Sequence, residues 1–521
     1  MTEPLPVLIV GAGPTGLWLA LWLTRLGVRV RIVDRAPAPG TTSRALAVHA
    51  RTMEFGDQVG IAAAMVDAGI EVESLNLWVG GRRAARVPIR RIGEGLSPFP
   101  FPLVLPQDVH ERLLIDHLLT LGVQVERPVT LSRFHQDEQS IRAVLNCDGA
   151  EETVDVSYLA GCDGASSTVR EQLGIGFPGG TYSGMFYVAD VEATGPAVDG
   201  SVHVDIEDED FAIVFPLKAG ARVRLVGLLR DRAQPLQELS LDDVKGRAIA
   251  HLQLHVTNVQ WFSTYRVHHR VATRFRSGRA FLLGDAAHIH SPVGGQGMNT
   301  GIGDAVNLSW KLAAVLRQRV SDALLDTYEP ERIAFARQLV ATTDRAFTFV
   351  TAPGRVARLL RTRMAPALAP WVTELASMRR LIFLVVSQIR IRYRRSALSA
   401  GRAGAVHGGD RLPWVETAPG EYNYAALKSL TWQVHVYGDA PAALADTCAA
   451  LGLPLHRFSW LPAMQRAGLK RGALYLLRPD GYVGLADANA DPDRLRRYCQ
   501  GLGITHQDQG PGNRDQGPGA G

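Results

Sequence analysis

The sequence predicts an α/β protein in which a parallel sheet is interleaved with a mainly antiparallel one. Three observations lead to this prediction. An apolar run at residues 7–10 precedes a glycine-rich turn and a helix-length run at residues 17–26. Residues 178–275 alternate in the manner of short strands, and a second glycine-rich segment at residues 284–299 follows another buried-strand pattern. Such interleaving indicates a small-molecule pocket between domains.

The first glycine-rich turn reads G-x-G-x-x-G from Gly11 and lies between a predicted strand and a predicted helix. This is the context of a dinucleotide-binding site. Gly11 permits the tight turn, Gly13 lets the backbone approach a pyrophosphate, and Gly16 lets the helix pack on the strand. Pro14 and Thr15 lie in the same turn, where the helix N-terminus faces the phosphate charge. A Rossmann-like domain is therefore expected at the start of the chain.

A second predicted strand at residues 28–33 ends at Asp34, and Arg35 follows. An acidic side chain at this position accepts both hydroxyl hydrogens of a ribose diol. The alternative is an ordinary glycine-bearing turn. It is disfavoured because strand, turn, helix, strand and acid occur in register.

The second glycine-rich segment carries a carboxylate at the end of a predicted strand. Asp285 follows Gly284 directly and would be a positioned acceptor for a sugar hydroxyl. Gly295 and Gly297 would let backbone amides approach a flat ring without interference from side chains. Asn299 is expected to open a helix whose N-terminal amides stabilise negative charge. The two glycine-rich segments are therefore predicted to bracket one cofactor.

The first glycine-rich segment, the stretch Gly161-Cys-Asp-Gly-Ala-Ser-Ser-Thr-Val-Arg170 and the stretch at residues 284–312, which ends with Asp304-Ala-Val-Asn-Leu-Ser-Trp-Lys-Leu312, resemble the three fingerprints of the FAD-dependent aromatic hydroxylases. These are single-component flavin monooxygenases of the para-hydroxybenzoate hydroxylase and phenol hydroxylase type. The resemblance covers about residues 5–345 and implies FAD as cofactor and NAD(P)H as co-substrate. It further implies hydroxylation of a phenolic or polyketide-like aromatic small molecule with O2, through a flavin C4a-hydroperoxide. Natural product biosynthesis is the favoured setting.

The resemblance also assigns roles to single residues. Asp285 would hold a ribityl hydroxyl of FAD, and the loop from Pro292 to Asn299 would lie against the isoalloxazine. Asp163 would lie near FAD and the route of NAD(P)H. Arg44 would affect the movement and reduction of the flavin, so that Arg44 and Pro292 are the candidate catalytic residues. The predicted cofactor-binding residues are Gly11, Gly13, Pro14, Thr15, Gly16, Asp34, Arg35, Arg44, Gln107, Asp163, Gly284, Asp285, Pro292, Gly295, Gly297, Met298 and Asn299.

The pattern along the chain predicts several parts. They are an FAD-binding domain at residues 1–75, 103–177 and 276–345, a sheet substrate domain at 76–102 and 178–275, a helical connector at 346–407, a C-terminal domain at 408–505, and a disordered tail at 506–521. The C-terminal domain resembles the thioredoxin-like domain of the phenol hydroxylase branch. It contains no C-x-x-C, so redox exchange is not expected. A structural or dimer-related role is predicted instead, which leaves a homodimer open.

Composition excludes several other classes of protein. With 56 basic and 51 acidic residues interspersed and a net charge of +5, the chain does not call for a nucleic-acid partner. Its 4 cysteines are too few and too scattered for a disulfide framework or a zinc site, and a cytoplasmic location fits them. The longest later apolar stretch, at residues 381–386, is too short for a membrane span. His288 and His290 lack a third ligand pattern, so no metal is expected.

The substrate-activating residue is not readable from the sequence. Candidates in the sheet domain are Tyr182, Tyr187, His203 and Arg224, but each is better explained as a structural or surface residue. Two other functions stay open. The chain could be a Baeyer-Villiger or dehydrogenating flavoenzyme of the same fold, or a non-catalytic FAD-dependent protein that sequesters a small molecule.

Overall fold

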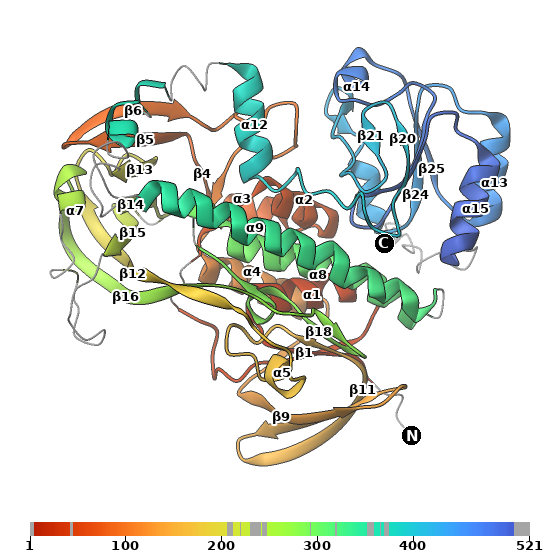
Figure 1. Cartoon of the computed structure of the whole chain (residues 1–521), viewed down its shortest axis with the longest axis horizontal. Helices are drawn as coiled ribbons and strands as arrows, with labels where there is room; N and C mark the ends of the chain where they lie inside the picture. The colour runs from red at the N-terminus through yellow and green to blue at the C-terminus, as the bar shows by residue number, and fades with distance from the viewer. Residues whose placement is uncertain are drawn as a thin grey trace, which may run out of the picture. The chain divides into compact units, whose positions relative to one another are not determined.

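The structure is a computed structural model. It describes residues 5–41, 45–205, 212–218, 220–229, 241, 247–291, 293–317, 320–351, 359–364, 366–368 and 375–504. The chain forms two compact units. The first comprises Met1–Trp18, Arg31–Ala305 and Arg332–Arg390, and the second comprises Leu19–Val30, Val306–Glu331 and Ile391–Gly521. The predicted mixed α/β fold is confirmed, as Figure 1 shows.

The first sheet is built around the apolar run at the start of the chain. Val7, Leu8 and Ile9 are fully buried, as expected for a parallel strand covered on both faces. The path of the sheet is β17 (Arg276–Ser277), β18 (Ala280–Leu282), β11 (Ala150–Gly161), β1 (Leu5–Val10), β2 (Val30–Val33) and β8 (Val125–Glu126). The pairs β1–β11, β11–β18 and β2–β8 are parallel, and β9 (Val129–Gln136) and β10 (Ile141–Cys147) extend β11 in antiparallel pairing.

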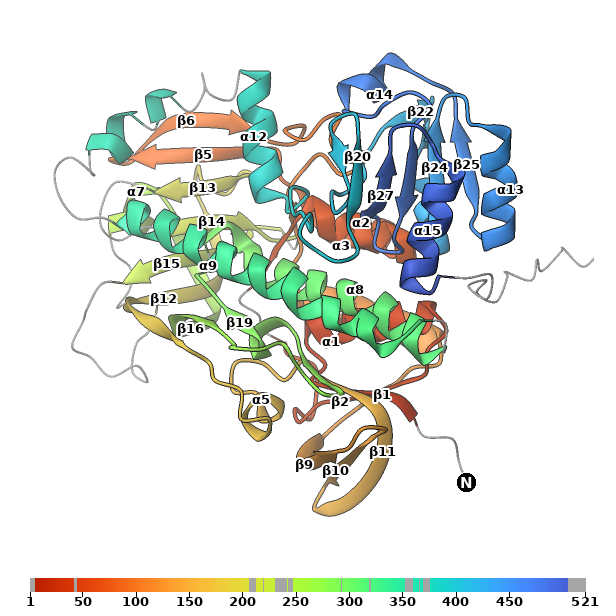
Figure 2. The same ribbon diagram turned by 45° about the vertical axis from the view of Figure 1, so that its right-hand side comes forward.

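Most strands of the second sheet come from residues 178–275, where strand-like alternation of apolar and polar residues was predicted. Figure 2 shows the strands of this sheet side by side. Its order is β19 (His288–Ile289), β16 (His255–Val271), β12 (Gly179–Thr194), β15 (Arg222–Leu229), β14 (Ala212–Pro216), β13 (Val202–Asp205), β5 (Ser74–Val79) and β6 (Arg82–Pro88). The pair β13–β5 is parallel. Because side chains alternate along a strand, Tyr187 and Val214 pack in one apolar cluster, whereas Phe186 and Val226 pack in another on the opposite face.

Helices and short strands complete the first unit. A small sheet is formed by β3 (Ala47–Val48), β7 (Leu103–Val104) and β4 (Ile70–Glu71). The predicted second strand begins at Val30, and the predicted helix at Asn299 begins earlier, at Gln296, because the turn ends with Gly295. The helical segments are α1 (Pro14–Arg25), α2 (Ala50–Val59), α3 (Ala62–Ala68), α4 (Gln107–Thr120), α5 (Thr168–Gln172), α7 (Arg247–His251), η1 (Gly284–Ala286), η2 (Val293–Gly295), α8 (Gln296–Leu316), α9 (Tyr328–Thr351), η4 (Leu360–Met364) and α12 (Ala376–Val386). The helices α1, α8 and α9 give residues to both units.

The second unit contains its own mixed sheet. The order is β21 (Val406–His407), β20 (Ala400–Ala403), β27 (Val483–Asp487), β26 (Leu474–Leu477), β24 (Gln433–Tyr437) and β25 (Leu455–Phe458). Tyr437, Tyr475 and Leu477 are fully buried in its core. The remaining elements are η3 (Asp322–Thr327), β22 (Glu416–Ala418), β23 (Glu421–Tyr422), η5 (Ala425–Ser429), α13 (Ala442–Leu451), α14 (Pro462–Arg466) and α15 (Pro492–Leu502).

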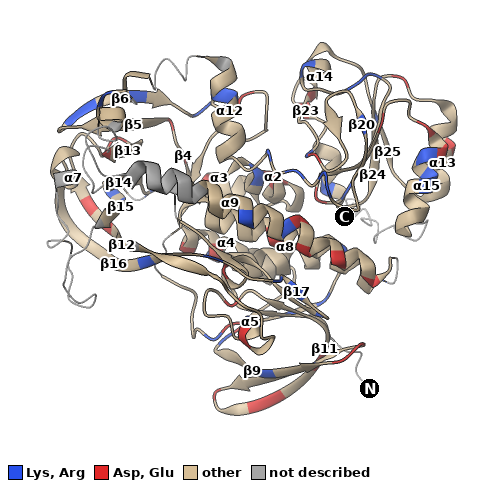
Figure 3. Cartoon of the chain, viewed as in Figure 1, with Lys and Arg blue, Asp and Glu red and all other residues tan. Residues whose placement is uncertain are grey.

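Charged residues of both signs are interspersed over the elements, as the colours of Figure 3 show. Several of them pair between strands: Arg142 on β10 contacts Asp155 on the neighbouring β11 at 2.9 Å, and Arg133 on β9 contacts Glu151 on β11 at 2.8 Å. In the part of the chain that the structure describes, no helix combines the length and the apolar character needed to cross a membrane. The apolar stretch at residues 381–386 lies at the end of α12, where Leu381 and Val385 are exposed and Phe383 is buried.

A buried ionic cluster lies in the second unit. Glu331, at the start of α9, accepts from Lys311 Nζ at 2.9 Å and from both terminal nitrogens of Arg478 at 2.8 and 3.1 Å. Arg478 also pairs with Asp480 at 2.6 Å, and all of these side chains are at most 2 % exposed. Burial lowers the pKa of Lys311 to about 8, although Glu331 opposes this change. The cluster joins residues of α8 and α9 to the strands at the end of the chain.

Replacing Glu331 should therefore destabilise the protein strongly. Glu331→Gln leaves Lys311 and Arg478 short of a buried counter-charge, and we expect the free energy of unfolding to fall by about 3–5 kcal/mol. Urea denaturation followed by circular dichroism measures this loss. Glu151→Gln, which breaks an exposed pair, is the control and should change stability little. Equal stability of the two variants would contradict the structural role of the cluster.

Candidate functional site

The glycine-rich turn after β1 has the conformation that its glycines were predicted to allow. Gly11 has a φ of 102°, in the region that favours glycine. A Cβ at Gly11 would collide with the carbonyl oxygen of Cys162, and one at Gly16 would collide with that of Gly11. A Cβ at Gly13 would meet nothing within 4 Å. The turn is thus packed at Gly11 and Gly16 and open at Gly13, where a ligand can approach the backbone.

The two glycine-rich segments, distant in sequence, meet at Thr15. A Cβ added to Gly284 would lie 2.6 Å from Thr15 Oγ1, and one added to Gly301 would also collide with this hydroxyl. Only glycine therefore lets α1 come this close to the segment after β18. The contact brings the predicted pyrophosphate turn and the predicted ribityl-binding segment into one site.

Asp34 is held rigidly at the end of β2. Its Oδ2 accepts from the backbone N–H of Ala12 at 2.7 Å and its Oδ1 from that of Ala36 at 2.8 Å. Arg127 forms an ion pair with Oδ1 at 3.0 Å. The Arg127 side chain is 10 % exposed, and its Nε is buried without a hydrogen-bond partner among the described residues. Sequence reasoning missed Arg127, because it follows β8, whose parallel pairing with β2 is visible only in the structure.

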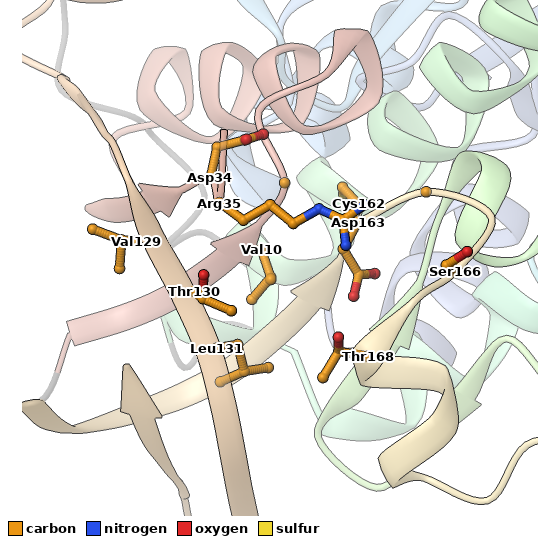
Figure 4. A pocket seen from close by; sticks show the side chains of 12 residues that line it. Val10, Asp34, Arg35, Val129, Thr130, Leu131, Cys162, Asp163, Ser166 and Thr168 are labelled. Carbon is orange, nitrogen blue, oxygen red and sulfur yellow. The ribbon is translucent and has the colours of Figure 1, made fainter. Parts of the chain in front are cut away.

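A cavity of about 230 Å³ opens beside this carboxylate. Figure 4 shows Arg35 extending across it from the side of Asp34 toward Asp163. Apolar side chains and charged groups share its walls, a combination that suits a nucleoside. The lining residues are Val10, Gly11, Asp34, Arg35, Val129, Thr130, Leu131, Cys162, Asp163, Gly164, Ser166 and Thr168.

The predicted Asp163 lines the cavity and also stabilises the turn that follows. It accepts from Ser167 Oγ at 2.6 Å and from the backbone N–H of Val169 at 3.1 Å. Burial raises the pKa of Asp163, and the bond from Ser167 opposes this rise. Arg170 then donates to the carbonyl oxygen of Ala286 at 3.0 Å. The Asp163 segment is thereby connected to η1, which contains the exposed Asp285.

A fully buried carboxylate, Asp304 on α8, fixes the start of the second glycine-rich segment. Its Oδ2 accepts from the N–H of Gly284 at 3.0 Å and lies 2.7 Å from His288 Nε2. Its Oδ1 accepts from Arg332 Nε at 2.5 Å. Burial alone would raise the pKa of Asp304, but Arg332 and His288 hold it below its usual range. His288 therefore binds a carboxylate, and the described residues contain no group of three or more His, Cys, Asp or Glu side chains placed to hold a metal ion.

Asn299 fixes the other end of the segment. Its Oδ1 accepts from the N–H of His49 at 2.9 Å and from Thr52 Oγ1 at 2.8 Å. Its Nδ2 donates to the carbonyl oxygens of Ala47 and Gly295. His49 Nε2 lies 3.0 Å from the carbonyl oxygen of Gly294, and burial lowers the pKa of His49 to about 4. Gly294 and Gly295, which we call the glycine loop, are thus attached to the segment that leads into α2.

Of the other predicted site residues, some lie in helices that the structure describes and two lie outside the described residues. Gln107 is the first residue of α4 and donates to Glu111 Oε1 at 2.7 Å. Gly297 and Met298 are partly buried in the first turn of α8. The two candidate catalytic residues, Arg44 and Pro292, lie outside the described residues.

The candidates for substrate activation have structural partners. Arg224 forms a bidentate pair with Asp190 at 2.6 and 2.7 Å. His203 lies 2.9 Å from Trp78 Nε1, and Tyr187 is 2 % exposed in the sheet core. Tyr182 is partly buried against the cluster on the other face. Arg224, His203 and Tyr187 are thus engaged within the sheet, and the expectation that each of the four is a structural or surface residue stays a prediction.

A comparison with known proteins identifies the family. A family model described as an FAD binding domain matches residues 4–343. This chain belongs to the FAD-dependent aromatic hydroxylases. The predicted recognition is confirmed, and the chain is an FAD-dependent monooxygenase of the aromatic hydroxylase type. The site fits FAD, since the backbone is open at Gly13 and a cavity adjoins Asp34.

Relatives of this hydroxylase match it over nearly its whole length. The 6-methylpretetramide 4-monooxygenase of Streptomyces rimosus is 34% identical over 98% of this chain and 95% of its own. The solved structure of OxyS anhydrotetracycline hydroxylase from Streptomyces rimosus has a TM-score of 0.76 at 27% identity, over 97% of this chain and 99% of its own. The Diels-Alderase PyrE3 of pyrroindomycin biosynthesis has a TM-score of 0.74 at 28% identity, over 96% and 99%.

Acid should destabilise this hydroxylase through His49. Its folded pKa of about 4 lies below the unfolded value, so the stability it contributes is complete above pH 6.5 and is lost as the pH falls toward 4. At pH 5 this loss is about 2 kcal/mol relative to pH 7. Thermal unfolding at several pH values measures it. His49→Gln, which keeps a donor for Gly294 but cannot be protonated, should show a smaller decline, and an unchanged decline would contradict the assignment.

Arg127 is expected to support cofactor affinity by positioning Asp34. Arg127→Met keeps much of the side-chain volume but removes the ion pair, and we expect FAD affinity to fall by about 1–3 kcal/mol. Fluorescence titration of the apoprotein with FAD measures the change. Arg133→Met, which breaks an exposed pair on β9, is the matched control. Equal affinity of the Arg127 variant and the parent would rule out this role.

Proposed function

We propose that this monooxygenase hydroxylates a polycyclic phenolic compound of the polyketide type, with NAD(P)H and O2 as co-substrates. The observation that carries the proposal is an aromatic face on the large sheet of the first unit. Phe186 on β12 is the cross-strand neighbour of Tyr265 on β16 and of Leu228 on β15. The rings of Phe186 and Tyr265 are stacked with centroids 5.7 Å apart. The partly buried Phe215 and Trp261 extend this face.

Phe186 and Leu228 are themselves buried, so a substrate would meet the partly buried rings of Tyr265, Trp261 and Phe215. Several aromatic rings on one face favour fused rings over a single small phenol. Stacked and edge contacts with aromatic side chains add to the burial of apolar surface, and both grow with the number of rings. The names of two relatives agree, since one acts on 6-methylpretetramide and another on anhydrotetracycline. We infer that the substrate lies against this face, with its reactive carbon directed toward the glycine loop.

The proposed cofactor contacts are those expected from the sequence, and the open backbone at Gly13 and the cavity beside Asp34 support them. Gly11, Gly13, Pro14, Thr15 and Gly16 would hold the pyrophosphate with the amides at the N-terminus of α1. Asp34 and Arg35 would bind the adenosine half, while Gln107 and Asp163 would adjoin the phosphate and ribityl region. Gly284 and Asp285 would bind the ribityl chain. Arg44, Pro292, Gly295, Gly297, Met298 and Asn299 would lie around the isoalloxazine.

When bound, FAD supplies the hydride acceptor for NAD(P)H and the activation of O2. The chain's own residues bind, orient and exclude water. The N–H groups at the start of α8 would stabilise negative charge at the ring, because they point out of the helix N-terminus. The apolar face of the sheet keeps the reacting carbon in a dry environment. No nucleophilic side chain is required.

The domain division is part of the proposal. We propose that the last unit contains a thioredoxin-like fold, and its strand order β25-β24-β26-β27, with α13 joining the parallel pair β24–β25, supports this. Cys448 and Cys499 are both buried, so a redox role is not proposed. No disulfide joins any of the 4 cysteines, all of which lie in the described part of the chain, and this supports a cytoplasmic location. A homodimer formed through this unit is a hypothesis that light scattering tests.

A second function is favoured by one observation. PyrE3, a relative over almost its full length, is described as a Diels-Alderase rather than a monooxygenase. The same fold could therefore bind FAD as a structural group and act on its substrate without net oxidation. Ring insertion and dehydrogenation are further outcomes for a flavoenzyme of this type.

Substrate-stimulated NAD(P)H oxidation distinguishes these functions. The purified protein, with its flavin spectrum recorded, is mixed in air with NADPH or NADH and a panel of single-ring phenols and polycyclic aromatic polyketides. We expect polycyclic compounds to accelerate oxidation and to gain one oxygen atom, seen as an increase of 16 mass units by mass spectrometry, with free FAD as the control. A product without added oxygen would favour the second function. Acceleration by single-ring phenols alone would overturn the proposed substrate class.

A further inference from the structure

The second residue after α12 has an unusual backbone. Gln388 has a φ of 61°, a conformation that favours glycine, and its side chain is only 5 % exposed. A glutamine is rarely held in this region unless the surroundings compensate for the strain. The compensation comes from its side-chain amide.

The amide of Gln388 binds the N-terminus of α8. Its Nε2 donates to Gln296 Oε1 at 2.6 Å and to Thr300 Oγ1 at 3.0 Å. In return, Gln296 Nε2 donates to the carbonyl oxygen of Val386 at 3.0 Å. The two glutamine side chains thus form a reciprocal clamp between the end of α12 and the start of α8. All four residues belong to the first unit.

Gln296 directly follows the glycine loop. Gly294 and Gly295 have positive φ values of 79° and 62° and lack side chains that could fix the loop. On one side the loop is held by His49 and Asn299, which bind the carbonyl oxygens of Gly294 and Gly295. On the other side the clamp from Gln388 to Gln296 limits its movement. The position of the loop is therefore set from two directions.

We propose that Gln388 is a positioning residue for the flavin ring, acting through Gln296. This inference rests on the proposed function, in which the glycine loop lies against the isoalloxazine. The side chain of Gln388 does not touch the reacting atoms in this scheme. It fixes the backbone amides of the loop, and so keeps reduction of the flavin coupled to oxygen transfer. The left-handed backbone at Gln388 is retained because it aims the amide at Gln296.

Gln388→Gly tests the role of the amide apart from backbone strain. Glycine adopts the same φ without cost, so a fall of the thermal midpoint would report the lost amide contacts and not backbone strain. Without the clamp, we expect FAD to bind about three- to tenfold more weakly, as loss of a buried hydrogen bond predicts. The visible absorption bands of bound FAD should shift. A larger share of NAD(P)H should be consumed in the uncoupled reaction NAD(P)H + H⁺ + O2 → NAD(P)⁺ + H2O2, measured as peroxide released.

The chain offers a matched control. Gln253 also has a left-handed backbone, with a φ of 53°, and its Nε2 donates to the carbonyl oxygen of Gly81 at 2.8 Å, in the sheet region. Gln253→Gly should leave FAD affinity, the flavin spectrum and peroxide release unchanged. If it altered them as much as Gln388→Gly does, the effect would be general and the positioning role would be wrong.

A double variant tests the route through Gln296. Gln296→Ala should change the flavin spectrum in the same direction as Gln388→Gly, and the double variant should change it no further, because both break one clamp. Additive changes would overturn the proposed route. An unaltered spectrum, affinity and coupling in Gln388→Gly, beside a parent with normal turnover, would overturn the inference alone. A parent that takes up no FAD would overturn the proposed function together with it.

Discussion

The buried carboxylate of Asp304 is the constraint on which the site depends. One oxygen accepts from Gly284 and contacts His288, while the other accepts from Arg332. A charge without exposure to water is costly unless it is fully paired, and Arg332 provides this pairing from α9. Arg332 also donates to the carbonyl oxygen of Thr300. A single charge pair therefore determines the relation of β18, the glycine loop and two long helices.

This arrangement explains why the glycines of the loop are tolerated. A loop without side chains loses more conformational entropy on folding than any other kind of backbone. Here the cost is offset at fixed points, by Asp304 at the beginning and by Asn299 and Gln388 near the end. Gly294 and Gly295 carry no side chain, so this part of the segment can present its backbone to a flat ring.

The sequence predicted the turn after β1 well, because the glycines of this turn are required by steric contacts within a short motif. Gly11 and Gly16 are required by contacts with their immediate neighbours, and Asp34 ends a strand whose pattern is visible in a few residues. Asp304 lay within a recognised fingerprint, yet its role depends on Arg332, which is recognisable only once α8 and α9 pack. Arg127 and Gln388 were missed for the same reason. Each acts across more than 90 residues of sequence, and no local pattern encodes such a partner.

The large second sheet likewise could not be predicted in full from the sequence. Alternation predicted strands at residues 178–275, but it could not show that β5 pairs in parallel with β13, since register depends on which face meets the core. It also could not distinguish a reactive side chain from a structural one. Arg224 is chemically suited to bind a phenolate, and only the carboxylate of Asp190 beside it reveals that its charge is already neutralised.

The ionic cluster around Glu331 bears on how this chain could be shortened or recombined. Arg478 and Asp480 follow β26, close to the end of the described chain, but their partners Lys311 and Glu331 lie on helices that begin or end in the cofactor-binding part. A fragment ending near residue 390 would retain Glu331 and Lys311 and lose the guanidinium that balances them. The C-terminal part is therefore not an interchangeable module. Exchange between related hydroxylases would have to carry the matching segment of residues 306–331 with it.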